Sequence, residues 1–179
     1  MKNSADVIKY LNENWSGKVG GPIKTLDILM ENSGYFEVPH LLMTYIEYLS
    51  GLYSGKGSQC KYTDVQEYLS CHFPSKYKET SSWLIYLYRH GLVHQYAPKS
   101  IKTDNRKILS WYISLDSSEA KQHLTIVKHP KKLSEVYHLS ICVPEFVRDF
   151  KSSIEMFCND ILNNSNRFNC FVCGYEKYA

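Results

Sequence analysis

Apolar residues recur three and four positions apart through much of the chain, a spacing typical of helices with one buried face. The most regular stripe follows Pro39, which fits a first helical turn, and continues to a break at Gly55. Pro98 disfavours helix at the residue before it, so the helix rich in aromatic residues should end at about Tyr96. The pattern predicts helices that begin at Ser4 and that cover Thr25–Asn32, Pro39–Ser54, Thr63–Phe73 and Thr80–Tyr96.

The period changes from helical to alternating after residue 107. Apolar and polar residues alternate in KILSWYISL, in HLTIV and in VYHLSIC, and the turn-forming stretches DSSE and KHPKK separate these runs. We therefore expect a three-stranded antiparallel insert over about residues 107–143. Pro144 then opens a last helix with an apolar stripe from Phe146 to Ile161, and the polar run after it predicts a tail over 165–179. The expected fold is mainly α, a helical bundle over 1–164 with a small β insert before its last helix.

The composition adds limits to this picture. Apolar residues make up 44% of the 179 residues and charged residues 22%, which is enough for one domain with a real core. The net charge of +3 permits an anionic partner without requiring one. The N-terminus has no apolar signal region, and the longest apolar run, Trp83–Tyr88, is too short to cross a bilayer. We expect a soluble, cytoplasmic protein with no membrane partner.

The six cysteines are not spaced like the disulfide framework of a small secreted protein, so we expect reduced thiols. Cys170 and Cys173 form a CxxC pair that resembles half of a zinc ribbon. A second CxxC pair is missing, and the sequence therefore favours an exposed pair of thiols over a metal or redox site.

The stretch RHGLVHQY, residues 89–96, places ionisable groups at the end of an apolar helix. On an α-helix His90 and His94 are about 40° apart on one face, whereas Arg89 and His94 are about 140° apart. A long guanidinium side chain can still reach back toward the imidazole. Gly91 allows close approach of a neighbouring backbone, so two such helices packed together would bring arginine and histidine into one cleft.

These residue types suit cleavage of a phosphodiester in RNA. The imidazole of His94 can exchange protons near neutral pH, and the guanidinium of Arg89 matches phosphate oxygens. The RNA supplies the nucleophile through its 2′-hydroxyl, so no metal or other cofactor is needed. Two other interpretations of the stretch stay open. In the first, Arg89 and His94 form an exposed helix end whose cations cap the last carbonyl groups. In the second, His90 and His94 bind zinc, although the further ligands of a closed zinc site are missing nearby in the sequence.

The pattern of Arg89, His94 and Tyr96, with a polar residue directly after the arginine, resembles the Arg-x4-His-x-Tyr signature of the HEPN superfamily (higher eukaryotes and prokaryotes nucleotide-binding). The resemblance implies an all-helical core that forms a homodimer, with the two motifs in a shared cleft. It also implies a metal-independent endoribonuclease, a hydrolase that leaves 2′,3′-cyclic phosphate ends, often in toxin–antitoxin or phage-defence systems. In some toxins a partner nucleotidyltransferase-type antitoxin AMPylates the motif tyrosine, here Tyr96. The β insert departs from the simplest members.

Further residues are candidates for supporting roles. His90 and Glu47 are placed to orient the catalytic groups, although Glu47 would also suit an ordinary surface position. Four basic residues follow the motif in the sequence, Lys99, Lys102, Arg106 and Lys107. They either contact the RNA backbone or form a solvated charged rim. The alternative to a ribonuclease is a catalytically inactive HEPN-like module that binds RNA, a nucleotide or a protein partner.

Overall fold

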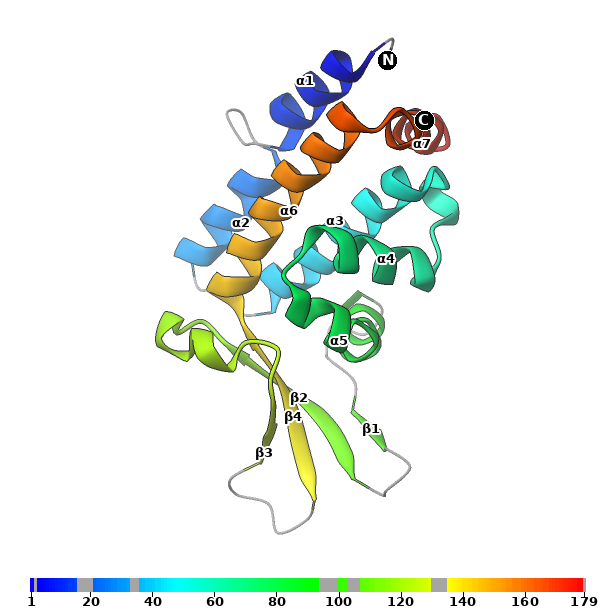
Figure 1. Ribbon diagram of the computed structural model, residues 1–179. Coiled ribbons are helices and arrows are strands. Elements are labelled where there is room, and N and C mark those ends of the chain that lie inside the picture. Colours follow the sequence, from blue (N-terminus) through cyan, green and yellow to red (C-terminus); the bar gives the residue numbers. More distant parts are fainter. Residues whose placement is uncertain are drawn as a thin grey trace.

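The protein is mainly helical, with a small sheet at one end of the helices (Figure 1). The computed structural model describes residue 1 and residues 3–15, 21–32, 36–93, 100–102, 107–129 and 135–178, with only the backbone of 90–93. The α-helices are α1 Ser4–Trp15, α2 Pro22–Glu31, α3 Glu37–Ser54, α4 Tyr62–His72, α5 Ser75–Leu84, α6 Val143–Asn163 and α7 Ser165–Glu176. Short 3₁₀ turns lie at η1 Gly57–Gln59 and η3 Ser117–Gln122. Among the described residues, no helix combines the length and apolarity needed to cross a membrane.

Helix α3 is the centre of the bundle and follows the expected apolar stripe closely. Its buried face includes Leu42, Ile46 and Leu49, all with no exposed surface. Gly55 ends the helix in the left-handed region, with φ of 72°, where glycine has no steric penalty. Helices α2, α4, α6 and α7 all pack against α3. The long α6 runs from the sheet across the bundle beside α1 and α2 (Figure 1).

The helix expected from Thr80 begins five residues earlier and changes its hydrogen bonding midway. Pro74 has an extended backbone and precedes α5, and Tyr77 in the first turn is fully buried. From Ile85 to Val93 the chain is a π-helix, η2, a form that is rare and often found at functional sites. The hydroxyl of Tyr88 in η2 lies 2.9 Å from the carbonyl oxygen of Leu139 and 3.2 Å from that of Tyr112. The π-helix is thereby tied to the sheet. The expected end at Tyr96 lies outside the described residues.

The sheet differs from the expected antiparallel meander. Within the described ranges it has four strands, β1 Ile101–Lys102, β2 Ile108–Ser114, β3 Ile126–Lys128 and β4 Val136–Cys142, in the order β1-β2-β4-β3. The β1–β2 and β3–β4 pairs are antiparallel, but β2 and β4 run parallel from Ile108 opposite Val136 to Ser114 opposite Cys142. A parallel pair needs a long crossover connection, and the segment between β2 and β4, which includes η3 and β3, is long enough to provide one. Strand β4 can therefore lie directly beside β2.

The run His123–Val127 was expected to be a strand, and only its last two residues belong to β3. His123 and Leu124 are buried, and the Leu124 amide donates to the Ser140 carbonyl at 2.7 Å. Leu124 has φ of 60°, which is incompatible with an extended strand. These two residues anchor the crossover to β4 instead of extending β3.

The expected tail over 165–179 is wrong for most of its length, because Ser165–Glu176 form helix α7, which packs against α3. Asn164 caps α7 by accepting from the amides of Asn166 and Arg167, and Phe171 is fully buried. At Gly174 the backbones come very close: a Cβ there would lie 2.7 Å from the Gly51 carbonyl oxygen and 2.9 Å from the Leu52 Cα. The polar run NNSNRFN contains this cap and the first turn of a helix.

We expect Gly174→Ala to destabilise the protein by about 1–3 kcal/mol, because the new methyl group overlaps α3 backbone atoms that cannot rotate away. The better helix propensity of alanine, about 1 kcal/mol, offsets only part of this loss. Urea unfolding measures the change. The matched control is Cys173→Ala, on an exposed position of the same turn, for which we expect less than about 0.5 kcal/mol. Equal stability of Gly174→Ala and wild type would contradict the close packing.

Candidate functional site

Arg89 is the motif residue whose side chain the structure places. It lies in η2 directly after the buried Tyr88 and points to Glu47 on α3. The Arg89 Nε donates to the Glu47 Oε2 at 3.0 Å, and the Arg89 Nη2 donates to the Glu47 Oε1. The side chains are 18% and 27% exposed, so this bidentate pair is mostly shielded from water. The hydrogen bonds that Arg89 donates to Glu47 raise the pKa of Arg89 above its ordinary value and hold the guanidinium charged.

The other predicted motif residues are not brought together by what the structure describes. His94, Tyr96, Lys99 and Arg106 lie outside the described residues. The backbone of His90 belongs to η2, and its side chain is outside the description. Glu47 was named from the sequence as a residue that orients a catalytic cation. It does contact Arg89, and its catalytic role stays a prediction.

The two remaining basic candidates lie at the sheet. Lys102 is in β1. Lys107 directly precedes β2, where its Nζ is 3.7 Å from the Glu135 Oε2 and 5.3 Å from the centre of the Tyr137 ring. Lys107 thus contacts an acidic side chain and an aromatic ring at the end of the sheet.

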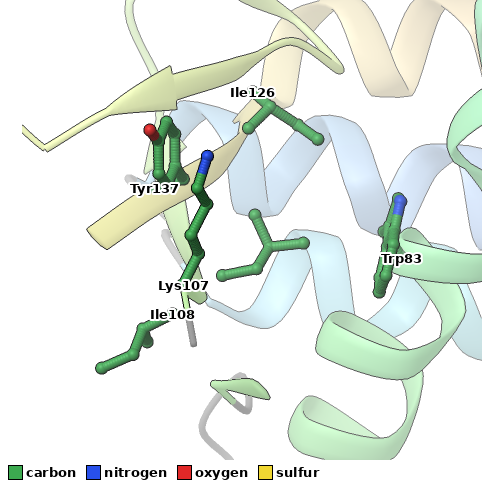
Figure 2. A pocket seen from close by; sticks show the side chains of 6 residues that line it. Trp83, Lys107, Ile108, Ile126 and Tyr137 are labelled. Atoms are coloured by element: carbon green, nitrogen blue, oxygen red, sulfur yellow. The ribbon is translucent and has the colours of Figure 1, made fainter. Parts of the chain in front are cut away.

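Lys107 also borders a small cavity between α5 and the sheet (Figure 2). Trp83 forms one wall, and side chains of β2, β3 and β4 form the other. Its volume of about 220 Å³ is below the range common for small-molecule sites, roughly 300–1,000 Å³. The lining residues are Trp83, Lys107, Ile108, Leu109, Ile126 and Tyr137. The part of this lining that the structure describes is mostly apolar and includes the cation of Lys107.

A buried polar cluster joins α5, the crossover and α6, and sequence reasoning did not find it. The Cys142 amide donates to the Nδ1 of His123 at 3.1 Å, so the neutral ring carries its proton on Nε2. That nitrogen is 2.8 Å from the hydroxyl of Tyr77, which donates to the Asp149 Oδ2 at 3.1 Å. Alternation alone placed His123 in a strand, and no spacing signal links these three residues.

Two cations lie at the solvent side of this cluster. The Lys76 Nζ is 3.2 Å from the Asp149 Oδ2, and the Arg148 Nη2 is 3.3 Å from the Asp149 Oδ1. Burial, then the positive charge of Lys76, lowers the pKa of His123 to about 3, against the opposing effect of Asp149. A histidine that is neutral at physiological pH and has both ring nitrogens engaged is suited to holding the sheet on the bundle.

A second buried histidine, His72, lies where α4, α6 and α7 meet. Its Nδ1 is 3.3 Å from the Tyr68 carbonyl oxygen, and its Nε2 is 3.6 Å from the Asp160 Oδ2. The Arg167 Nε also donates to Asp160, at 3.1 Å. Burial lowers the pKa of His72, against the opposing effects of the Tyr68 carbonyl and of Asp160.

Comparison with protein-family models, curated proteins and solved structures finds no match for this chain. Within the described ranges no three histidine, cysteine or acidic side chains gather in a way that would hold a metal ion. Cys170 and Cys173 both lie in α7. The chemistry of the candidate site therefore centres on Arg89 and Glu47.

Proposed function

We propose that this chain is a metal-independent endoribonuclease of the HEPN type that uses Arg89 and His94. The observation that supports it is the shielded ion pair between Arg89 on the π-helix η2 and Glu47 on α3. The last residue of η2, Val93, directly precedes His94 in the sequence. A guanidinium held by two hydrogen bonds is already oriented, and orientation in advance is what transition-state stabilisation requires. The π-helix is a further support, because such helices recur at functional sites.

In the proposed reaction His94 removes the proton of the RNA 2′-hydroxyl, and the 2′-oxygen attacks the adjacent phosphorus. The bond from phosphorus to the 5′-oxygen breaks, the 5′-oxygen takes up a proton, and the RNA is left with a 2′,3′-cyclic phosphate. Arg89 stabilises the negative charge that builds up on the phosphoryl oxygens. Glu47 sets the direction of the guanidinium.

The finer parts of the proposal concern partners. Two copies of the chain would form a homodimer and contribute Arg89 and His94 from each to one cleft. Lys99, Lys102, Arg106 and Lys107 would follow the RNA backbone, a contribution that weakens with salt. The setting would be a toxin–antitoxin or phage-defence system, with Tyr96 as the target of a nucleotidyltransferase-type antitoxin.

A second candidate is a catalytically inactive HEPN-like module that binds RNA, a nucleotide or a protein. The same ion pair favours it, since Glu47 neutralises the guanidinium that an RNA phosphate would otherwise approach. This candidate differs from the first in a simple way: it binds without cleaving.

The test is cleavage of a mixed-sequence single-stranded RNA in excess EDTA, with His94→Ala beside the wild type. General acid–base catalysis contributes about 100- to 10,000-fold, so we expect the variant to lose at least two orders of magnitude in rate. Wild-type products should end in 2′,3′-cyclic phosphate. Equal cleavage by both proteins would overturn the role of His94, and binding without cleavage by both would favour the inactive module.

A further inference from the structure

A pocket of about 480 Å³ lies beside η3 on one face of the sheet, opposite the face that carries the buried Leu139 and Ile141. Side chains alternate across a strand, so Tyr112 of β2 shares this face with His138 and Ser140 of β4, while Leu139 and Ile141 point into the core. The other lining residues are Gln122 of η3, Val127 and Lys128 of β3, and His129 directly after β3. The pocket shares no residue with the pair of Arg89 and Glu47 or with the cavity beside Trp83.

Three rings make one side of this pocket a surface for stacking. The ring centres of His129 and His138 are 4.6 Å apart at an angle of 43°, and those of Tyr112 and His138 are 6.5 Å apart. The His138 ring is fixed, because its Nδ1 donates to the Trp111 carbonyl oxygen at 3.0 Å. Aromatic and imidazole rings on a sheet surface are a common way to hold the bases of single-stranded nucleic acid.

A buried hydroxyl at the pocket has no partner in the described part of the chain. The Oγ of Ser140 makes no hydrogen bond there, and Ser140 is only 2% exposed. An unsatisfied buried polar group costs about 1–3 kcal/mol, so a ligand that supplies the missing hydrogen bond gains affinity. The hydroxyl of Ser140 and the amide of Gln122 each can donate and accept, which matches the mixed edge of a heterocycle.

The charge and the volume narrow the ligand further. Lys128 adds a cation to the lining, which suits a phosphate attached to the ring. The volume lies within the range of small-molecule sites, and a lining that is mostly apolar with a few polar groups is typical of them. From these features together we propose that the pocket binds a nucleobase that carries a phosphate, either as a free mononucleotide or within single-stranded RNA. The site is independent of the proposed cleavage reaction.

The experiment is calorimetric titration of the full chain with AMP, GMP, CMP and UMP, and separately with a 2′-O-methylated oligonucleotide. The methylated strand lacks the 2′-hydroxyl nucleophile, so its binding is measured whether or not the protein cleaves RNA. We expect saturable binding. The affinity should fall about tenfold in Tyr112→Ala, because the substitution removes a stacking ring. The affinity of Ser140→Ala should fall about fivefold. This variant should fold normally, because the hydroxyl that it removes has no hydrogen-bond partner among the described residues.

The matched control is Tyr62→Ala, which removes a tyrosine of similar exposure, 42% against 41% for Tyr112, on α4 outside the pocket. Its affinity should equal that of the wild type. Binding of mononucleotides identifies a free nucleotide as sufficient, and binding of the oligonucleotide alone identifies RNA as the source of the base. Absence of binding for every probe, or equal affinity of wild type, Tyr112→Ala and Ser140→Ala, would overturn the proposal.

Discussion

Replacing Arg89 by alanine should lower the rate of RNA cleavage by about 100- to 1,000-fold, the effect typical of removing one donor that stabilises transition-state charge. Arg89→Lys should recover little of this loss. Lysine keeps the positive charge but cannot form the two parallel hydrogen bonds that orient the guanidinium on Glu47. Initial rates on a defined single-stranded RNA in EDTA measure both variants.

In the same assay, Glu47→Gln separates the two effects of Glu47 on Arg89, the orientation of the guanidinium and the negative charge beside it. The amide keeps one acceptor for Arg89 and removes the negative charge, so we expect a loss of about tenfold, smaller than that of Arg89→Ala. Lys9→Ala is the control for removing a surface cation, since Lys9 pairs with Glu13 on the exposed face of α1. Full activity of Arg89→Ala with an intact fold would remove Arg89 from the reaction.

The second large effect is a loss of stability on mild acidification. Burial holds the pKa of His123 at about 3 in the folded protein, below the value of about 6.5 expected for the unfolded chain. The unfolded chain therefore binds the proton first. The contribution of neutral His123 to the free energy of unfolding is complete above pH 6.5 and is lost as the pH falls toward 3. The loss for this one residue is up to about 1.4 kcal/mol per pH unit.

Urea unfolding between pH 7.5 and 5.5, above the range where carboxylates titrate, measures this slope. His123→Gln removes the titrating group while its amide can still accept from Cys142 and donate to Tyr77. Its free energy of unfolding should depend less on pH than that of the wild type. His72→Gln should also flatten the curve, since burial lowers the pKa of His72 as well. Identical slopes in wild type and His123→Gln would contradict a buried neutral His123.

The helices could be predicted from sequence where local pattern and tertiary packing agree. The stripe after Pro39 fixes which face of α3 is buried, and Gly55 ends the helix for a local steric reason. The start of α5 was missed because its first turn is polar except for Tyr77. The burial of Tyr77 comes from partners far along the chain, His123 and Asp149, that no local pattern reveals.

The sheet and the end of the chain show the limits of periodicity. Alternation correctly indicates strands at β2 and β4, but it does not tell a parallel from an antiparallel pair. That choice depends on the path of the crossover through His123 and Leu124. Helix α7 was missed for a related reason: its apolar face is narrow, and its packing on α3 depends on the close approach of Gly174 to Gly51.

The candidate site was predictable in part. The composition of RHGLVHQY identified Arg89, and the polar side of the Pro39 helix identified Glu47, which the structure brings into contact. The π-helical form of η2 has no sequence signal, since the same residues fit an α-helical stripe. The role of His94 in the same site stays a prediction.

The central claim is that the RNA itself supplies the nucleophile, without a metal, at the site of Arg89 and His94. It is tested most directly by mapping one cleaved bond in an RNA and replacing the 2′-hydroxyl before that bond by hydrogen. In excess EDTA we expect the wild-type chain to cleave the unmodified strand and to leave the modified bond intact. Continued cleavage at the modified bond would contradict the proposed reaction.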